Sequence, residues 1–155
     1  MPLAPNFANN LMQLIFESSA YTIANIADNP TGLSTAPLTN LWLSLHTAQP
    51  SSDNQTASEA GYTNYVRQAV ARSSAGFTAT LATSQGSGVT ISPLATISFP
   101  QATSGSSAET EAYFSIGKTS AGTTGILFSG TISPSLVIGP NVTPRLTTGT
   151  MLTLT

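Results

Sequence analysis

The chain contains no cysteine, which excludes both a disulfide framework and a thiolate metal site. It is also poor in charge, since Asp, Glu, Lys and Arg make up 6% of its residues, against about 25% in an average soluble domain. The four basic residues are scattered along the chain: Arg67, Arg72, Lys118 and Arg145. Nucleic-acid binding requires clustered basic side chains that displace counterions. We therefore expect no nucleic-acid partner.

Long hydrophobic runs are absent as well. No apolar segment approaches the roughly 18 residues of a membrane-spanning helix, and the first residues, MPLAPNFANN, do not have the pattern of a signal peptide. We therefore expect no membrane partner. Hydroxyl groups are abundant instead, with 21 Ser and 24 Thr. A sparsely charged, Thr-rich surface is typical of a protein that is assembled, secreted or packed against partners.

The N-terminal part of the chain predicts one amphipathic helix, over residues 5–20. Apolar residues recur at helical spacing on one of its faces, namely Phe7, Leu11, Leu14 and Ile15. Asn6 is the predicted cap of its first turn. This apolar face either covers one end of a sheet or docks on a neighbouring subunit.

From residue 41 the pattern becomes that of β-strands. In LWLSLHT, three leucines at 41, 43 and 45 alternate with Trp42, Ser44 and His46. Further candidate strands follow at intervals of roughly eight to twelve residues: they include YTNYVRQAVAR, GFTATLAT, LATISFP, EAYFSIGK, TGILFSGTI, SLVIG, TPRL and TMLTLT. This spacing predicts a mainly β protein, an antiparallel β-sandwich or jelly roll over 41–155. With the N-terminal α-helix and a loop over 25–40, it forms a single domain of 1–155.

His46 is the only histidine and the first candidate for chemistry. A Ser–His arrangement is not supported, because the chain has no G-x-S-x-G elbow. One histidine with scattered carboxylates does not make a metal site either. We interpret His46 as a strand-end residue whose ring hydrogen-bonds a neighbouring loop, and we predict no catalytic, cofactor-binding or metal-binding residues. The alternative from another class is a β-sandwich hydrolase with His46 and Glu59 as acid and base.

Glu109 and Glu111 lie two residues apart, so a strand would place them on one face. Paired carboxylates on one face are what a glycosidase requires. They flank the predicted start of a strand beside a Gly/Ser loop. We therefore interpret them as a solvated edge.

The segment GYTNYVRQAVAR holds the remaining dense group of aromatic and charged residues. In a continuous strand Tyr65 and Arg67 share a face, where the guanidinium can stack on the ring or pair with a carboxylate. We interpret Arg67 as an anchored charge that ties the strand to the preceding loop through Glu59. Carbohydrate or protein recognition is the alternative. The candidate structural or interface residues are Trp42, His46, Glu59, Tyr62, Tyr65 and Arg67.

The order of several short motifs resembles that of a family of small tailed-bacteriophage virion proteins. The motifs are SSAYTIA at the end of the predicted helix, LWLSLHTAQP, SEAGY, YVRQAV, ATISFPQAT and TGILFSGTISPSLVIGPNVTPRL. Within them, LHT-x-x-P followed by Y-x-R-Q is similar to the family's pattern. The likeness covers most of the chain.

The resemblance implies a non-enzymatic structural component of a virion. The leading hypothesis is a capsid decoration or cement protein that stabilises the shell through contacts between subunits. The alternative is a tail-fibre, adaptor or receptor-binding module, for which an exposed aromatic patch of Trp42, Tyr62 and Tyr65 would be the mark. The implied partners are further copies in a homotrimer and the major capsid protein or other virion proteins. The implied location is the capsid surface or tail of a virion assembled in the host cytoplasm.

Overall fold

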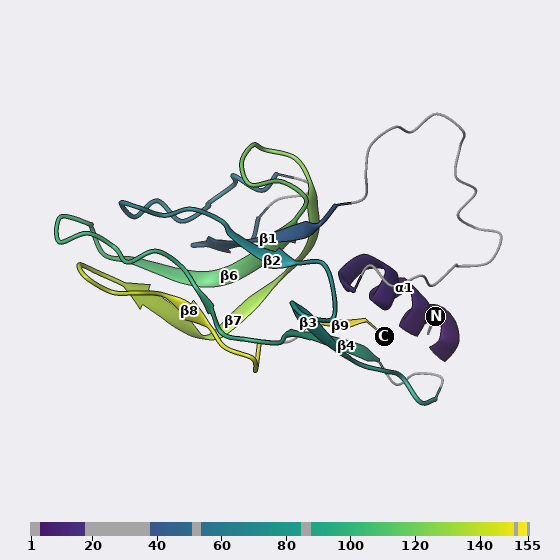
Figure 1. Cartoon of the computed structure of the whole chain (residues 1–155). Coiled ribbons are helices and arrows are strands. Elements are labelled where there is room, and N and C mark those ends of the chain that lie inside the picture. Colours follow the sequence, from purple (N-terminus) through teal and green to yellow (C-terminus); the bar gives the residue numbers. More distant parts are fainter. Residues whose placement is uncertain (1–3, 18–37, 51–53, 85–87, 151, 155) are drawn as a thin grey trace. The chain divides into compact units, whose positions relative to one another are not determined.

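The computed structural model describes residues 4–17, 38–50, 54–84, 88–150 and 152–154. The chain forms two compact units (Figure 1). Unit 1 comprises Met1–Thr39, Ala71–Ala95 and Thr148–Thr155, and unit 2 comprises Asn40–Val70 and Thr96–Thr147. The predicted class, a mainly β protein with antiparallel sheets and one N-terminal helix, is confirmed. The single domain of 1–155 stays a prediction, and most of the predicted loop over 25–40 lies outside the described residues.

Unit 1 combines a helix with a three-stranded antiparallel sheet. Its elements are α1 (Pro5–Phe16) and, in sheet order, β3 (Phe77–Thr80), β4 (Val89–Pro93) and β9 (Leu152–Leu154). The helix packs on β3 and β4. The rings of Phe16 and Phe77 meet edge to face, with centroids 5.1 Å apart. Helix α1 therefore covers a sheet, which is the first of the two predicted alternatives.

The ends of α1 differ from the predicted ones. The N-cap is Ala4 rather than Asn6, because Pro5 occupies the first turn, where its missing N–H is not needed and its fixed φ suits a helix. The helix ends at Phe16 with Glu17 as the C-cap residue. The predicted last residues, 18–20, lie outside the described residues.

The buried face of α1 is displaced by one position from the predicted face. Ala8, Met12 and Phe16 recur every four residues and are buried. The residues of the predicted face are only half-buried: Phe7, Leu11, Leu14 and Ile15. The apolar stripe is wider than the contact surface, and packing on the sheet selects one side of it.

Arg72 closes the C-terminal end of α1. Its Nε donates to the Ile15 carbonyl at 2.8 Å and its Nη2 to the Leu14 carbonyl at 2.6 Å. The last carbonyls of a helix lack intrahelical donors and carry partial negative charge. A cation at this position therefore stabilises the helix end.

Unit 2 contains the larger sheet. Its four strands, in sheet order, are β2 (Gln68–Ala71), β1 (Asn40–His46), β6 (Glu109–Gly117) and β7 (Ile126–Ile138). Two short strands pair separately: β5 (Ile97–Ser98) and β8 (Arg145–Leu146). In the sheet, β1 lies between β2 and β6. Strand β1 therefore has a hydrogen-bonded neighbour on each side.

The leucine face of β1 is buried, and on its other face Ser44 and His46 are buried while Trp42 is half-buried. The three leucines of the predicted apolar face are at most 2% exposed, and Leu43 and Leu45 lie opposite Ile116 and Phe114 of β6. The serine and histidine of the other face are 0% exposed. The alternation of residues correctly predicted that the three leucines share one face. The opposite face carries Ser44 and His46, and the residues that cover these two side chains form the candidate functional site.

Several strand boundaries were wrong. Of YTNYVRQAVAR, only residues 68–71 form a strand. Asn64 has a φ of 80°, and the Tyr65 N–H donates to the Tyr62 carbonyl, so the chain turns there. Tyr65 and Arg67 consequently do not share a strand face. Of LATISFP only residues 97–98 are a strand, and β4 was not predicted.

Candidate functional site: a sealed polar network on the second face of β1

The loop 54–60 is fastened to the end of β1 by its main chain. The Ala60 N–H donates to the Leu45 carbonyl and the Thr47 N–H to the Ser58 carbonyl, both at 2.9 Å. His46 and Glu59 form an antiparallel bridge between the same segments. These bonds place the loop beside the polar side chains of β1.

The His46 ring lies between this loop and β6. Its Nδ1 is 3.0 Å from the Ala57 carbonyl, and its Nε2 is 3.0 Å from Ser115 Oγ and 3.1 Å from Ser44 Oγ. Because a carbonyl only accepts, Nδ1 carries the proton and Nε2 accepts from a serine hydroxyl. Burial lowers the pKa of His46, so the ring is neutral at neutral pH. The predicted bond from this ring to a neighbouring loop is confirmed.

Two serines and a glutamine continue the network. The hydroxyls of Ser44 and Ser115, directly opposite each other on β1 and β6, are 2.7 Å apart. The Gln55 Nε2 donates to Ser44 Oγ at 3.1 Å. The Gln55 amide fills the space beside Gly117, where any Cβ would collide with it. The missing side chain of Gly117 therefore leaves room for the Gln55 amide against β6.

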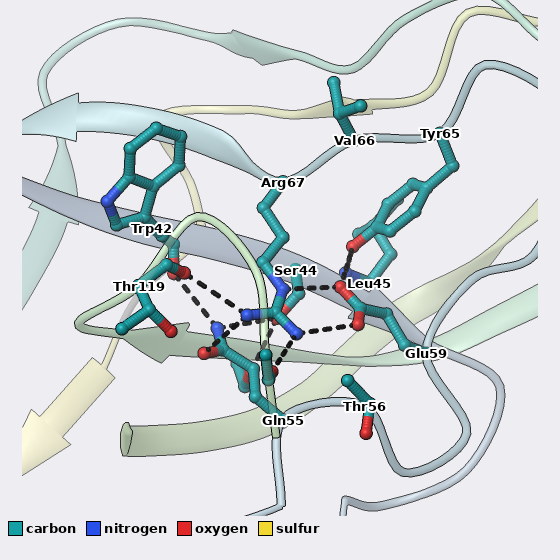
Figure 2. A network of polar contacts seen from close by, with 12 residues as sticks. Trp42, Ser44, Leu45, Gln55, Thr56, Glu59, Tyr65, Val66, Arg67 and Thr119 are labelled. Carbon is teal, nitrogen blue, oxygen red and sulfur yellow. Dashed lines mark hydrogen bonds and ion pairs between the residues drawn. The ribbon is translucent and has the colours of Figure 1, made fainter. Parts of the chain in front are cut away.

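Arg67 is the centre of the network (Figure 2). Its Nε and Nη2 donate to the two carboxylate oxygens of Glu59 at 2.7 and 2.8 Å, a bidentate ion pair. Nη1 donates to Gln55 Oε1 at 3.1 Å and to the Thr119 carbonyl at 3.2 Å. Nη2 also donates to the Gly122 carbonyl at 2.9 Å. The predicted tie from Arg67 to the preceding loop through Glu59 is confirmed, and all five guanidinium N–H groups are used.

Tyr65 adds an aromatic wall to the network. Its hydroxyl donates to Glu59 Oε1 at 3.0 Å and accepts from the Leu45 N–H at 3.1 Å. Its ring stacks on Phe99, with centroids 6.1 Å apart. Burial, followed by the charge of Glu59, raises the pKa of Tyr65 well above its usual value. The hydroxyl therefore remains protonated and continues to donate to Glu59.

The side chains of the other two aromatic candidates make no hydrogen bond to the network, although Gln55 Nε2 donates to the Trp42 carbonyl at 3.5 Å. The Tyr62 ring is 4% exposed and its hydroxyl donates to the Pro100 carbonyl at 3.0 Å. Trp42 is half-buried, and Figure 2 shows its indole apart from the polar contacts. Because Tyr62 is buried, Trp42, Tyr62 and Tyr65 do not form an exposed aromatic patch together.

A hollow of about 340 Å³ opens beside the ion pair and is lined, among others, by Glu59, Tyr65, Val66, Arg67 and Ser120. Arg67 has no N–H left for an anionic ligand. His46 and its serine partners are 0% exposed, so no substrate atom reaches them. The arrangement holds loops in place and offers no exposed Ser–His pair.

Glu109 and Glu111 do not form a solvated edge. Both belong to β6, and Glu111 is 0% exposed. Burial, and then the charge of Glu109, raises the pKa of Glu111 to about 8. The solvated-edge prediction was wrong for Glu111, which is covered, whereas Glu109, the first residue of β6, is half-buried. A glycosidase role is not supported either, since a substrate does not reach Glu111.

Among the described residues, no three His, Cys, Asp or Glu side chains gather as a metal cluster. No helix in that part of the chain is long and apolar enough to span a membrane.

The fold and the network together define a small antiparallel β protein whose buried polar groups secure its loops. Over residues 6–154 the chain matches the family described as "Podophage GP4 fiber I protein gp80", and it belongs to this family. No curated protein matches it. The membership supports a structural role in a phage virion and favours the tail-fibre alternative over the capsid-decoration hypothesis.

Proposed function

We propose that this protein is a non-enzymatic component of a podophage tail fibre. The family match, which spans nearly the whole chain, is the observation that carries the proposal. The geometry supports it, because the one histidine is sealed among serines and main-chain groups. The polar residues of the network hold loops in place. Such a role suits a structural component, whereas a catalyst needs polar groups that a substrate can reach.

The network prepares a surface for contact. Arg67 joins the loop 54–60, the turn around Tyr65 and the loop 119–122 through side-chain and main-chain bonds. Loops that are already ordered lose less conformational entropy when a partner binds. Val66, which is 56% exposed, lies at the hollow formed by these loops. We assign this surface to contact with another virion protein or with a host receptor.

The location on the particle is the sharpest test. Gold-labelled antibodies against the protein, applied to intact virions, are expected to mark the tail fibres in electron micrographs. Label over the shell instead would overturn the proposal and restore capsid decoration.

The contact surface has its own test. Val66→Lys places a charge at the hollow without touching the core, and we expect fewer particles that carry the protein or slower adsorption to host cells. Leu94→Lys is the matched control, since Leu94 is 52% exposed and lies in the other unit. Equal incorporation and adsorption of both variants would exclude the hollow as the contact surface.

We further propose that the protein assembles with itself as a homotrimer. Charged residues make up 6% of the chain, which leaves little electrostatic repulsion between copies. Sedimentation equilibrium of the full chain measures the state directly. A mass of one subunit at micromolar concentration would rule the homotrimer out.

A further inference from the structure

The Gln55 side-chain amide lies against a serine and a histidine that no substrate from outside reaches. Its Nε2 is 3.1 Å from Ser44 Oγ, and the same oxygen is 3.1 Å from His46 Nε2. All three side chains are 0% exposed. A serine hydroxyl beside a neutral imidazole is the pairing that activates an oxygen nucleophile. Here the group within reach of that hydroxyl is the chain's own amide.

The His46 ring is oriented to act as a base. Its Nδ1 carries the proton, because this atom lies 3.0 Å from the Ala57 carbonyl, and the lone pair of Nε2 points to the serine hydroxyls. When Ser44 donates to this nitrogen, Ser115 Oγ, 2.7 Å away, donates in turn to Ser44. A nucleophile, a base and a third group that orients the base are therefore all present.

Arg67 binds the oxygen of the same amide. Its Nη1 donates to Gln55 Oε1 at 3.1 Å, and this is the guanidinium nitrogen that Glu59 does not use. The bond identifies which end of the amide is the oxygen. A donor at this position also stabilises the negative charge that develops on a carbonyl oxygen when its carbon is attacked. Arg67 is 5% exposed, so water does not weaken this interaction.

We propose that Ser44 and Gln55 become joined by an ester, formed once by the folded chain acting on itself. The Gln55 Cδ atom is one covalent bond from the nitrogen that contacts Ser44 Oγ, and a turn of the amide plane presents it to that oxygen. The Oγ–Cδ bond forms while the Ser44 proton passes to His46 Nε2, and Arg67 Nη1 holds the charge on Oε1. The Cδ–Nε2 bond then breaks, His46 gives the proton to the departing nitrogen, and ammonia leaves.

Burial and proximity both favour this product. Two groups held together by the fold react as one molecule, which removes the entropic cost of bringing them together. Hydrolysis of the ester requires water at Cδ, and a closed site excludes water. The ester joins β1 covalently to the loop 54–60, beside the main-chain bonds from Ala60 to Leu45 and from Thr47 to Ser58. Its formation is independent of where on the virion the protein lies.

The first test is the mass of the full-length folded chain. We expect wild type to be lighter than its sequence by one ammonia. Cleavage before Asp53 should leave the two fragments joined, and hydroxylamine, which cleaves esters, should separate them. Ser44→Ala and Gln55→Glu should have the full mass of their sequences, because the first lacks the nucleophile and the second has no ammonia to release. Ser129→Ala, which removes an exposed serine of β7, is the matched control and should keep the deficit.

The wild-type measurement decides the proposal even if a variant does not fold. A wild-type chain with the full mass of its sequence would overturn the ester and leave the tail-fibre assignment intact. A deficit that persists in Ser44→Ala would overturn it as well, since an asparagine succinimide elsewhere also loses ammonia.

The role of His46 has a separate test. His46→Asn retains a donor for the Ala57 carbonyl but has no base, so we expect the mass deficit to be lost while the circular dichroism spectrum stays that of a folded β protein. A deficit as complete as that of wild type would overturn the role assigned to His46.

Discussion

Glu59 and Glu111 are two carboxyl groups of unit 2 whose surroundings differ. The Glu59 side chain is 15% exposed and receives a bidentate Arg67 together with the Tyr65 hydroxyl. Glu111 is 0% exposed and has no such partner among the described residues. The first is a completed ion pair that organises three loops. The second is a buried carboxyl group next to Glu109, and burial together with the neighbouring carboxylate favours its protonated form.

The two carboxyl groups therefore differ in their effect on the stability of the fold. A buried ion pair adds little net stability compared with apolar packing, but removing one partner is strongly destabilising. An unpaired buried carboxyl adds instability of its own as the pH rises, because ionisation without a partner is unfavourable. The two sites should consequently respond to mutation in opposite directions.

The largest effect is expected for Arg67→Met. It leaves the Glu59 carboxylate and the Gln55 amide oxygen without their donors, so the free energy of unfolding should fall by about 3–5 kcal/mol. Urea denaturation of the variant and of Arg145→Met, which removes an exposed arginine, measures the difference. Similar midpoints for the two variants would contradict a structural role for the Arg67 network.

Glu111→Gln should change the stability in the opposite direction. The pKa of Glu111 is raised from 4.5 to about 8, so its contribution is fully present below pH 4.5 and is lost as the pH rises through 8. The amide does not ionise, and the variant should be more stable than wild type by about 2–4 kcal/mol near pH 9. Chemical denaturation between pH 5 and 9 tests this. Glu17→Gln should keep the wild-type slope.

Gly117→Ala, which disturbs the Arg67 network at Gln55, should lower the stability by an intermediate amount. A Cβ at Gly117 collides with the Gln55 amide, and relieving such overpacking costs about 1–3 kcal/mol. Gly105→Ala is the control, because a Cβ there meets nothing within 4 Å. Calorimetry of both variants should show a lower Tm only for Gly117→Ala, and equal values would mean that Gln55 moves aside without cost.

The smallest effect is expected for the titration of His46. Its pKa is lowered by burial, so its contribution to stability is present above pH 6.5 and is lost as the pH falls below that value. The slope cannot exceed about 1.4 kcal/mol per pH unit. His46→Asn retains a donor for the Ala57 carbonyl and should flatten the acid side of the stability profile. An unchanged acid slope would assign that slope to another group.

Part of this site was predictable from the sequence. The bond from the His46 ring to a loop and the pairing of Arg67 with Glu59 are contacts between residues at most eleven positions apart. Such short separations let strand alternation and charge complementarity indicate partners. The prediction succeeded even though the supposed strand through Tyr65 is a turn, because the ion pair depends on proximity and not on a shared strand face.

The remaining partners had no local signal. Ser44 meets Ser115 across 71 residues, and Arg67 meets the Thr119 carbonyl across 52. Ser115 resembles any other of the 21 serines until β6 is paired with β1. The role of Gln55 and Gly117 likewise depends on the contact between the Gln55 amide and the space beside Gly117, which only the folded chain creates.

The sequence by itself determined the class of this protein, since strand periodicity, a single amphipathic N-terminal segment and scarce charge follow from local residue order. It also determined the leucine face of β1, because alternation decides which residues share a face. Only the tertiary structure decided that the opposite face is covered too, and that Glu111 is inside a sheet and not on its edge. Burial depends on which distant segment covers a residue, and periodicity within a strand carries no information about that segment.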